Sequence, residues 1–276
     1  MIFTGSNAAY MDLFCHMFYP TLRHFGRYRG DVKVVLLGPI DPKTRIRLRQ
    51  ANLAIEADTR KVDLSHVWKF EYAEHLQRKY EEVYYYDCDV WFQSDIHSMF
   101  ALARPGKMMV CEEFTTYDPD CFYRGRGFNE TSLTTLADWL PEGHRETVLN
   151  GFSRRRVINS GFFGGRQLGE VYEAIVHFCR GWPQTGFGFD QTIVNLWDFY
   201  FPETVRRIPE RYALALCRPP KGMRTCDSSR MMLGSKPVVA LHANRQRSPA
   251  DKLREPRFVR LMRAHPECRQ GVNPLR

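Results

Sequence analysis

Two aspartates, Asp87 and Asp89, stand one residue apart in the stretch YYYDCDVWF, which otherwise has the apolar character of a buried strand. Because burying like charges is costly, a pair at this place requires an explanation. On a regular strand the two carboxylates would point to opposite faces, so they can reach one ion only where the strand ends and turns. We expect that turn to begin near Val90. Paired carboxylates facing a diphosphate suit Mg²⁺ or Mn²⁺, although D-x-D spacing is also common among solvated acids.

A third candidate ligand, His242, ends the apolar run VVALH far downstream. Its imidazole could add a nitrogen ligand to the same ion, and nitrogen would favour Mn²⁺ over Mg²⁺. A strand-end histidine with a purely structural hydrogen bond is the simpler alternative for this residue taken alone.

Strands and helices alternate along the part of the chain that leads to the aspartates. Expected strands lie at 2–4, 31–38 and 82–90, and expected helices at 10–22, 42–50 and 63–77. This alternation predicts an α/β domain with a mostly parallel central sheet flanked by helices. Ligands of such sheets collect at the carboxyl ends of the strands, which is where the aspartates lie.

The later part of the chain continues the pattern less regularly. Expected strands lie at 107–113, 157–165 and 237–244, expected helices at 168–178, 189–201 and 251–263, and an irregular segment at 115–156. The last helix is basic and amphipathic, with cations at Lys252, Arg254, Arg257, Arg260 and Arg263. Such a helix could lie on an anionic membrane, or it could simply pack its apolar side on the domain.

Composition excludes some classes of protein. The 276 residues are 43% hydrophobic, enough to build a core, and contain no run of about 20 apolar residues that could span a membrane. A net charge of +9 favours an anionic partner such as nucleotide phosphates, an anionic membrane or nucleic acid, and a solvated basic surface explains it equally well. Eight cysteines without a C-x-x-C pair indicate a reducing, cytoplasmic compartment. The chain begins within its first expected strand, so it could be a domain of a larger protein.

Four short motifs, taken in their order along the chain, resemble those of nucleotide-diphosphosugar glycosyltransferases with the GT-A fold. VYYYDCDVWFQSDI resembles their metal-binding signature, VINSGFFGG their Asn-x-Gly strand, GFDQTIVN their Asp-Gln helix start and VVALHAN their late strand with a metal-ligating histidine. The pattern is most similar to glycosyltransferase family 8, which includes glycogenin and bacterial lipopolysaccharide galactosyltransferases. The resemblance runs from residue 1 to about residue 247.

The resemblance implies a role for each matching residue. The implied metal ligands are Asp87, Asp89 and His242, which would hold Mn²⁺ (or Mg²⁺) against the donor phosphates. The implied donor-binding residues are Thr4, Ser6, Asn7, Tyr10, Lys69, Asp87, Gly161 and Arg245. The implied catalytic residues, beside the reacting carbon and the sugar hydroxyls, are Asn159, Asp190 and Gln191. For the N-terminal residues, turn formation and helix capping carry comparable weight.

Two positions depart from the family pattern. Lys69 stands where the family often has an arginine. After His242 the family commonly has a glycine and a lysine that hold the diphosphate, whereas this chain has Arg245 and Arg247 nearby. Arginine can bind phosphate at least as well, often through two hydrogen bonds.

The implied activity is metal-dependent transfer of a hexose from a nucleotide-diphosphate sugar, a UDP-sugar, to a hydroxyl of a glycan, glycolipid or protein, with retention of anomeric configuration. The resemblance divides a single domain at 1–276 into a nucleotide-binding half (1–113), a sugar- and acceptor-binding half (114–247) and a basic C-terminal helix (248–276).

Three alternatives stay open. An inverting enzyme of the same fold would need a base, for which Glu112, Glu113 and Asp190 are candidates. A nucleotidyltransferase that makes the sugar nucleotide ranks lower, because TGSNAAY lacks the glycine-rich basic loop of such enzymes. A nucleic-acid-binding protein ranks lowest, because no RRM, helix-turn-helix or zinc-finger pattern is visible.

Overall fold

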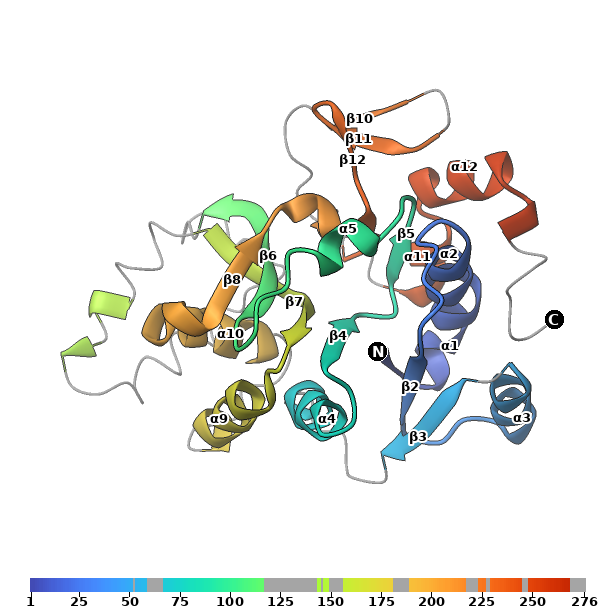
Figure 1. The fold of residues 1–276 in the computed structure, drawn as a ribbon. Coiled ribbons are helices and arrows are strands. Elements are labelled where there is room, and N and C mark those ends of the chain that lie inside the picture. The colour runs from blue at the N-terminus through green and yellow to red at the C-terminus, as the bar shows by residue number, and fades with distance from the viewer. Residues whose placement is uncertain are drawn as a thin grey trace. The chain divides into compact units, whose positions relative to one another are not determined.

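A computed structural model gives the fold of the chain (Figure 1). The residues that it describes are 1–51, 53–58, 67–116, 143–144, 146–148, 156–180, 189–216, 223–226, 229–244 and 248–268. The chain divides into two compact units. The first comprises Met1–Arg60, Tyr84–Leu102 and Pro209–Arg276, and the second comprises Lys61–Val83 and Ala103–Ile208. Each unit is assembled from separated segments, and the boundaries expected at residues 113 and 247 stay a prediction.

Parallel strands form the sheet of the first unit. Their order is β3-β2-β1-β4, with bounds β1 (Ile2–Ser6), β2 (Val32–Leu37), β3 (Ala54–Asp58) and β4 (Glu82–Tyr86). Ile2 of β1 lies opposite Val32 on one side and Tyr84 on the other, and both pairings are parallel. Every residue of β1 is buried, as expected for a strand inside a parallel sheet whose two faces are covered.

The first helical segment of this unit is continuous but irregular. It consists of η1 (Ala8–Tyr10), α1 (Met11–Leu13), η2 (Phe14–Phe18) and α2 (Tyr19–His24). The η2 segment is a π-helical turn. Pro20, which has no N–H to donate to the carbonyl four residues earlier, comes directly after this wider turn. The unit also contains α3 (Pro42–Gln50) and α5 (His97–Phe100).

Short strands complete the first unit and correct one expectation. A small sheet has the order β5-β13-β9, with bounds β5 (Val90–Phe92), β13 (Ala240–His242) and β9 (Leu214–Ala215). The prediction of a single strand over 82–90 with a turn from Val90 onwards is wrong. Strand β4 ends at Tyr86, the turn occupies residues 87–89, and Val90 already begins the next strand. A β-meander follows η4 (Glu210–Tyr212) and β9, with β10 (Met223–Thr225), β11 (Met231–Leu233) and β12 (Lys236–Pro237).

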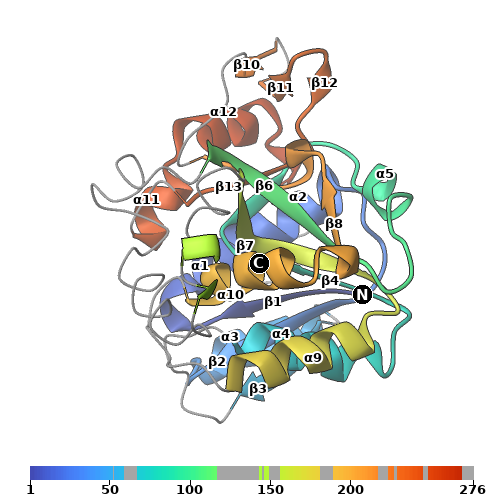
Figure 2. The same ribbon diagram turned by 90° about the vertical axis from the view of Figure 1, so that its left-hand side faces the viewer.

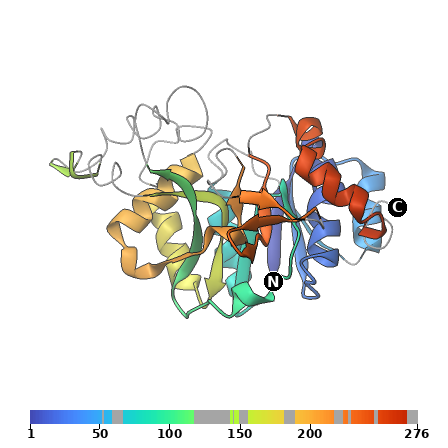
Figure 3. The ribbon, with the colours of Figure 1, turned by 90° about the horizontal axis from the view of Figure 1, so that it is seen from above.

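The C-terminal helix expected over 251–263 is two helices. They are α11 (Pro249–Leu253) and α12 (Pro256–Ala264). The break falls just before Pro256, because proline disfavours the helical conformation of the residue before it. Figure 3 shows α12, in red, beside the blue helices near the N-terminus. An edge-to-face contact between Phe25 and His265, with ring centroids 5.0 Å apart, connects the two regions.

The second unit also combines a sheet with helices. Its strand order is β7-β6-β8, with bounds β6 (Met108–Thr116), β7 (Arg156–Arg166) and β8 (Val205–Ile208). β6 is antiparallel to β7 and parallel to β8. The other elements are α4 (Trp68–Gln77), α9 (Gly169–Arg180), α10 (Phe189–Tyr200) and η3 (Pro202–Thr204). α4 packs along α9, and α10 packs on β7, as Figure 2 shows.

The predicted fold class is confirmed: most strands of the seven-stranded main sheet pair in parallel, and helices flank them. Aromatic side chains dominate the core, and Trp91, Tyr84, Tyr85 and Tyr86 are among the largest that are fully buried. Among the helices that the structure describes, none is both long and apolar enough to cross a membrane.

Candidate metal and donor site

The turn at residues 87–89 turns the two carboxylates toward a common point. It is closed by a hydrogen bond from the Val90 N–H to the Asp87 carbonyl oxygen, 3.1 Å long. Because the chain leaves the β4 direction at Asp87, the strand alternation that would separate the two side chains no longer applies. The two carboxylates can reach one ion only if the strand ends at them, and the strand does end there. The turn begins at Asp87, before the expected position near Val90.

Strand pairing brings His242 to the same point. β13 is antiparallel to β5, with His242 opposite Val90, and the Ala243 N–H donates to the Asp89 carbonyl oxygen at 3.0 Å. His242 Nε2 lies 3.1 Å from Asp89 Oδ1 and 3.5 Å from Asp87 Oδ2. Three residues separated by up to 155 positions in the chain thus bring their ligand atoms within 4.8 Å of one another.

A cation that the sequence did not assign to this place, Lys252 of α11, completes the cluster. Its ammonium contacts Asp89 Oδ2, and both side chains are buried. It also lies 5.7 Å from the centre of the Tyr10 ring. Sequence analysis grouped Lys252 with the basic face of the C-terminal helix. The sequence signal that could have pointed to Lys252 is the lysine that the resembled family commonly has after its late histidine. Arg245 and Arg247, which are nearer to His242, were the residues predicted for that role.

Neighbouring side chains hold the turn in place. The Tyr85 hydroxyl donates to Asp87 Oδ1. Between the two aspartates, Cys88 is buried, and burial together with the charges of Asp89 and Asp87 raises the pKa of its thiol. Cys88 therefore stays a neutral thiol beside the carboxylates.

Electrostatics of the cluster favour ionised groups in spite of burial. Burial by itself would raise the pKa of Asp89, but the charges and hydrogen bonds of His242 and Lys252 outweigh it and lower that pKa well below its ordinary value. Burial would lower the pKa values of His242 and Lys252, and the Asp89 carboxylate raises both instead. In the metal-free protein the buried Asp89 carboxylate is held between the Lys252 ammonium and the His242 imidazole.

The donor set fits a divalent ion. One ligand atom from each of Asp87, Asp89 and His242 lies within 4.8 Å of the others. Two carboxylates and one imidazole suit a borderline-hard ion such as Mn²⁺ better than Mg²⁺, which prefers oxygen alone. The pKa of Asp89 is lowered, so its carboxylate is already in the ionised form that binds metal.

Among the donor-binding residues expected near the N-terminus, the structure places some in structural roles. Thr4 and Ser6 are buried on β1. The Asn7 side chain accepts a 3.1 Å hydrogen bond from the Tyr10 N–H and so caps η1. Helix capping was the alternative to donor binding for these N-terminal residues. Within the described part of the chain, the buried Thr4 hydroxyl has no hydrogen-bond partner. Arg245 lies outside the described residues.

In the second unit, Lys69 and Asp190 form a buried ion pair. Lys69 Nζ lies 2.7 Å from Asp190 Oδ2, and the two side chains are only 5% and 6% exposed. Lys69 belongs to α4 and Asp190 to the first turn of α10, where a carboxylate also interacts favourably with the helix dipole. The structure therefore joins two residues that the sequence assigned separately to donor binding and catalysis.

The Asn159 strand is held by an amide that sequence analysis missed. Asn159 Oδ1 accepts a hydrogen bond from the Gly161 N–H at 2.7 Å, which fixes this side chain against its own strand. Asn195 of α10 accepts from the Ile158 N–H at 2.8 Å and donates to the Ile158 carbonyl oxygen at 2.9 Å. Asn195 also donates to the carbonyl oxygen of Gln191 at 2.7 Å. Its place one helical turn after Gln191 was the only signal in the sequence.

Of the three carboxylates considered as bases for an inverting reaction, the two whose side chains are described are engaged with cations. Glu112 lies between two guanidinium groups, with Arg207 Nη1 at 2.6 Å and Arg156 Nη1 at 3.5 Å. Asp190 is paired with Lys69. The side chain of Glu113 is not among those described. Both described carboxylates therefore already have cationic partners.

The basic face expected on the C-terminal helix is smaller than the sequence suggested. Lys252 is buried at the cluster, and Arg257 pairs with Glu255 at 3.0 Å. The apolar side of α12 is covered, because Phe258 and Leu261 are buried and Phe258 packs on Trp91. The apolar side therefore packs on the domain.

Several proteins of known structure share the fold of this chain. No family model and no curated protein matches the sequence. WbbM, a bifunctional glycosyltransferase, is similar in structure with a TM-score of 0.57 and 11% identity, over 98% of this chain and 49% of WbbM. The chain thus spans about half the length of WbbM.

Two further glycosyltransferases are similar in structure. An active-site mutant of LgtC has a TM-score of 0.56 and 11% identity, over 87% of this chain and 86% of LgtC. Another LgtC structure, of the galactosyltransferase with donor and acceptor sugar analogues, has a TM-score of 0.50, 10% identity and coverage of 78% and 75%. Mouse xyloside xylosyltransferase 1 has a TM-score of 0.50 and 10% identity, over 78% of this chain and 87% of that one. The chain has the fold of these proteins, and the GT-A resemblance is confirmed at the level of fold.

Proposed function

We propose that the chain is a metal-dependent glycosyltransferase that transfers a hexose from a nucleotide-diphosphate sugar, a UDP-hexose, to a hydroxyl group. The convergence of Asp87, Asp89 and His242 at the end of a parallel strand carries this proposal. The structural comparisons support the proposal, because the proteins named above that share this fold are glycosyltransferases. The acceptor would be a glycan, a glycolipid or a protein.

The proposed division of labour begins with the metal ligands. Asp87, Asp89 and His242 would hold a divalent ion, Mn²⁺ or Mg²⁺, which when bound supplies Lewis-acid stabilisation of the charge that develops on the leaving diphosphate. Because a bound metal would neutralise Asp89, Lys252 would then be available as a second cation for the diphosphate. Thr4, Ser6, Asn7 and Tyr10 would contact the nucleoside, and Arg245 the phosphates.

Residues of the second unit would hold the sugar. Lys69 donates a hydrogen bond to the Asp190 carboxylate and so fixes its orientation, and this carboxylate would accept a hydrogen bond from a donor hydroxyl. Asn159, Gly161 and Gln191 would shape the surroundings of the reacting carbon. In this arrangement the Asp190 pair acts in orientation and not in proton transfer.

Retention of anomeric configuration is part of the proposal. An inverting reaction needs a carboxylate base on the face opposite the leaving group, and Glu112 and Asp190 are both engaged with cations. In the retaining reaction the acceptor hydroxyl attacks the anomeric carbon from the face of the leaving group. Its proton passes to the departing diphosphate oxygen, the C–O bond to that oxygen breaks, and the new glycosidic C–O bond forms.

The test is to screen nucleotide sugars by thermal shift with and without Mn²⁺, then to follow release of the nucleoside diphosphate by the stabilising donor. We expect stabilisation to require both metal and donor, and turnover to stop in excess chelator. Asp89→Asn and His242→Ala should abolish metal-dependent binding, whereas the exposed control Asp31→Asn should behave as wild type. Equal turnover in chelator would overturn the metal role, and release of pyrophosphate from a nucleoside triphosphate and a sugar 1-phosphate would indicate a nucleotidyltransferase instead.

The setting of the reaction also stays a proposal. A cytoplasmic location and a peripheral contact with an anionic membrane fit a basic protein that acts on a glycolipid. Binding to vesicles with and without anionic lipid tests the membrane contact. Binding that does not depend on anionic lipid would contradict the membrane contact.

A further inference from the structure

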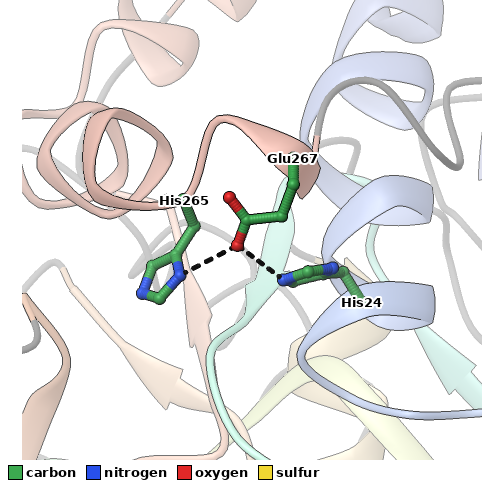
Figure 4. Close-up of side chains that lie close together, drawn as sticks. All are labelled: His24, His265 and Glu267. Atoms are coloured by element: carbon green, nitrogen blue, oxygen red, sulfur yellow. Dashed lines mark hydrogen bonds and ion pairs between the residues drawn. The ribbon is translucent and has the colours of Figure 1, made fainter.

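A second group of metal-ligating side chains lies apart from the proposed catalytic site. It consists of His24 at the end of α2, His265 just after α12, and Glu267 two residues further on. None of the three belongs to the cluster of Asp87, Asp89 and His242. Figure 4 shows both imidazole rings facing the same carboxylate oxygen.

The distances suit a small tetrahedral ion. Glu267 Oε1 lies 3.4 Å from His24 Nε2 and 3.2 Å from His265 Nδ1. The three ligand atoms all lie within 4.8 Å of one another. With ligand bonds of about 2.1 Å, a tetrahedral zinc ion separates neighbouring ligand atoms by about 3.4 Å. The two separations between the carboxylate oxygen and the imidazole nitrogens lie close to this value, and the separation between the two imidazole nitrogens does not exceed 4.8 Å.

The imidazole rings are held in position before any ion binds. The buried ring of Phe25 makes edge-to-face contacts with both of them, with centroids 4.6 Å from His24 and 5.0 Å from His265. Two backbone hydrogen bonds fix the turn that carries the carboxylate, from the His265 N–H to the Leu261 carbonyl and from the Cys268 N–H to the His265 carbonyl, each 3.1 Å long. A site whose ligands are restrained loses less entropy on binding.

The charge and exposure of the group also suit a metal with an open position. A backbone hydrogen bond to its carboxylate and the neighbouring His265 lower the pKa of Glu267, so that it is ionised at neutral pH. Its side chain is 57% exposed, against 31% for His24 and 24% for His265. Solvent can therefore reach the ion and supply the fourth ligand.

We propose that His24, His265 and Glu267 bind a divalent transition-metal ion, with Zn²⁺ preferred. Two imidazoles with one carboxylate and a water form a four-coordinate set typical of zinc, whereas Mg²⁺ and Ca²⁺ prefer oxygen alone. The bound ion would cross-link the segment that follows α12 to α2. It would thus fix the C-terminal region to the helix near the N-terminus without taking part in glycosyl transfer.

The test is titration of the metal-free full chain with Zn²⁺ by calorimetry, and with Co²⁺ as a spectroscopic probe of tetrahedral coordination. Wild type should bind one more equivalent than His24→Gln or Glu267→Gln, and only wild type should give the Co²⁺ spectrum of this site. The matched control is His97→Gln, an exposed histidine 2.6 Å from the carboxylate of Asp95, which should keep the full stoichiometry.

The experiment also separates this site from the proposed catalytic one. Zn²⁺ can occupy the cluster at Asp89 as well, so the same titration is made in an Asp89→Asn background, where one equivalent should persist and be lost with Glu267→Gln. All of the substituted side chains of the second site are exposed or half-exposed, so the variants should fold. Unchanged stoichiometry in His24→Gln and Glu267→Gln would overturn the proposal and leave a hydrogen-bonded His–Glu–His group.

Discussion

The ammonium of Lys252 contacts the Asp89 carboxylate across 163 residues of sequence, in a site where both side chains are buried. The contact places a protein cation on a carboxylate that is also a candidate metal ligand. A bound metal ion and Lys252 therefore compete for the charge of Asp89.

Replacing this cation should change stability and metal affinity in opposite directions. In Lys252→Met the buried Asp89 carboxylate keeps His242 but loses its other cation, so the metal-free protein should lose about 3 kcal/mol of unfolding free energy. The same change removes the competitor, so Mn²⁺ should bind more tightly and raise the melting temperature by more than in wild type. Urea unfolding in chelator measures the change in stability, and calorimetry with Mn²⁺ measures the change in affinity.

The exposed control on the same segment, Arg254→Met, should change neither stability nor Mn²⁺ affinity. Weaker Mn²⁺ binding in Lys252→Met would show that Lys252 does not compete with the ion.

The buried pair of Lys69 and Asp190 should be strongly coupled. Lys69→Met removes the cation that contacts the buried Asp190 carboxylate and should cost about 3–5 kcal/mol of unfolding free energy, and Asp190→Asn should cost a similar or smaller amount. The double variant should be more stable than the sum of the two losses predicts, because each single change removes the same interaction. Urea unfolding of the four proteins gives the coupling energy. Lys79→Met, an exposed change in the same unit, serves as the control. Additive losses would mean that the pair contributes nothing as a pair.

The pH dependence of stability in the metal-free protein follows from the directions of two pKa shifts. The folded pKa of Asp89 is lowered, so its contribution is present above the ordinary value of 3.8 and is lost as the pH falls below that value. The folded pKa of His242 is raised, so its contribution is present below 6.5 and is lost as the pH rises through the folded pKa. Unfolding free energies measured in chelator should thus decline on both sides of this window.

Asp89→Asn provides the check on that pH profile, since the same carboxylate causes the shift at His242. In this variant both slopes should become shallower, whereas Asp31→Asn should keep the wild-type profile. A wild-type profile in Asp89→Asn would place the origin of the pH dependence elsewhere.

The amide of Asn195 should be a strong local determinant of stability. Asn195→Leu leaves the buried N–H and carbonyl of Ile158 without their side-chain partner, which should cost about 1–3 kcal/mol. Gln50→Leu, an exposed amide-to-leucine change, is the control and should be near neutral. Hydrogen exchange at the Ile158 amide gives a second readout, because that amide should exchange faster in Asn195→Leu alone. An unchanged exchange rate would show that other contacts protect this amide.

The expectations that proved wrong share a cause. The turn after Tyr86 begins at Asp87 and not at Val90, and the C-terminal helix is broken before Pro256. Both errors concern where an element ends. Apolar patterning reports burial over several residues, and the runs before and after Asp87 are equally apolar, so nothing in the pattern marks the end of the first strand. Proline at 256 was a visible signal for the second break.

The α/β class, the mostly parallel sheet and the candidacy of Asp87, Asp89 and His242 follow from the amino-acid sequence. Alternating apolar patterns and residue chemistry are local properties, and they can be read without coordinates. The meeting of His242 with the aspartates requires the three-dimensional fold, because the position of His242 depends on the pairing of β13 with β5. The fold also determines that Lys252 lies against Asp89, that Lys69 pairs with Asp190, and that His24 shares a carboxylate with His265. Charges this far apart in the chain choose partners only when the packing of the core brings their backbones together, and burial then makes the choice costly to undo.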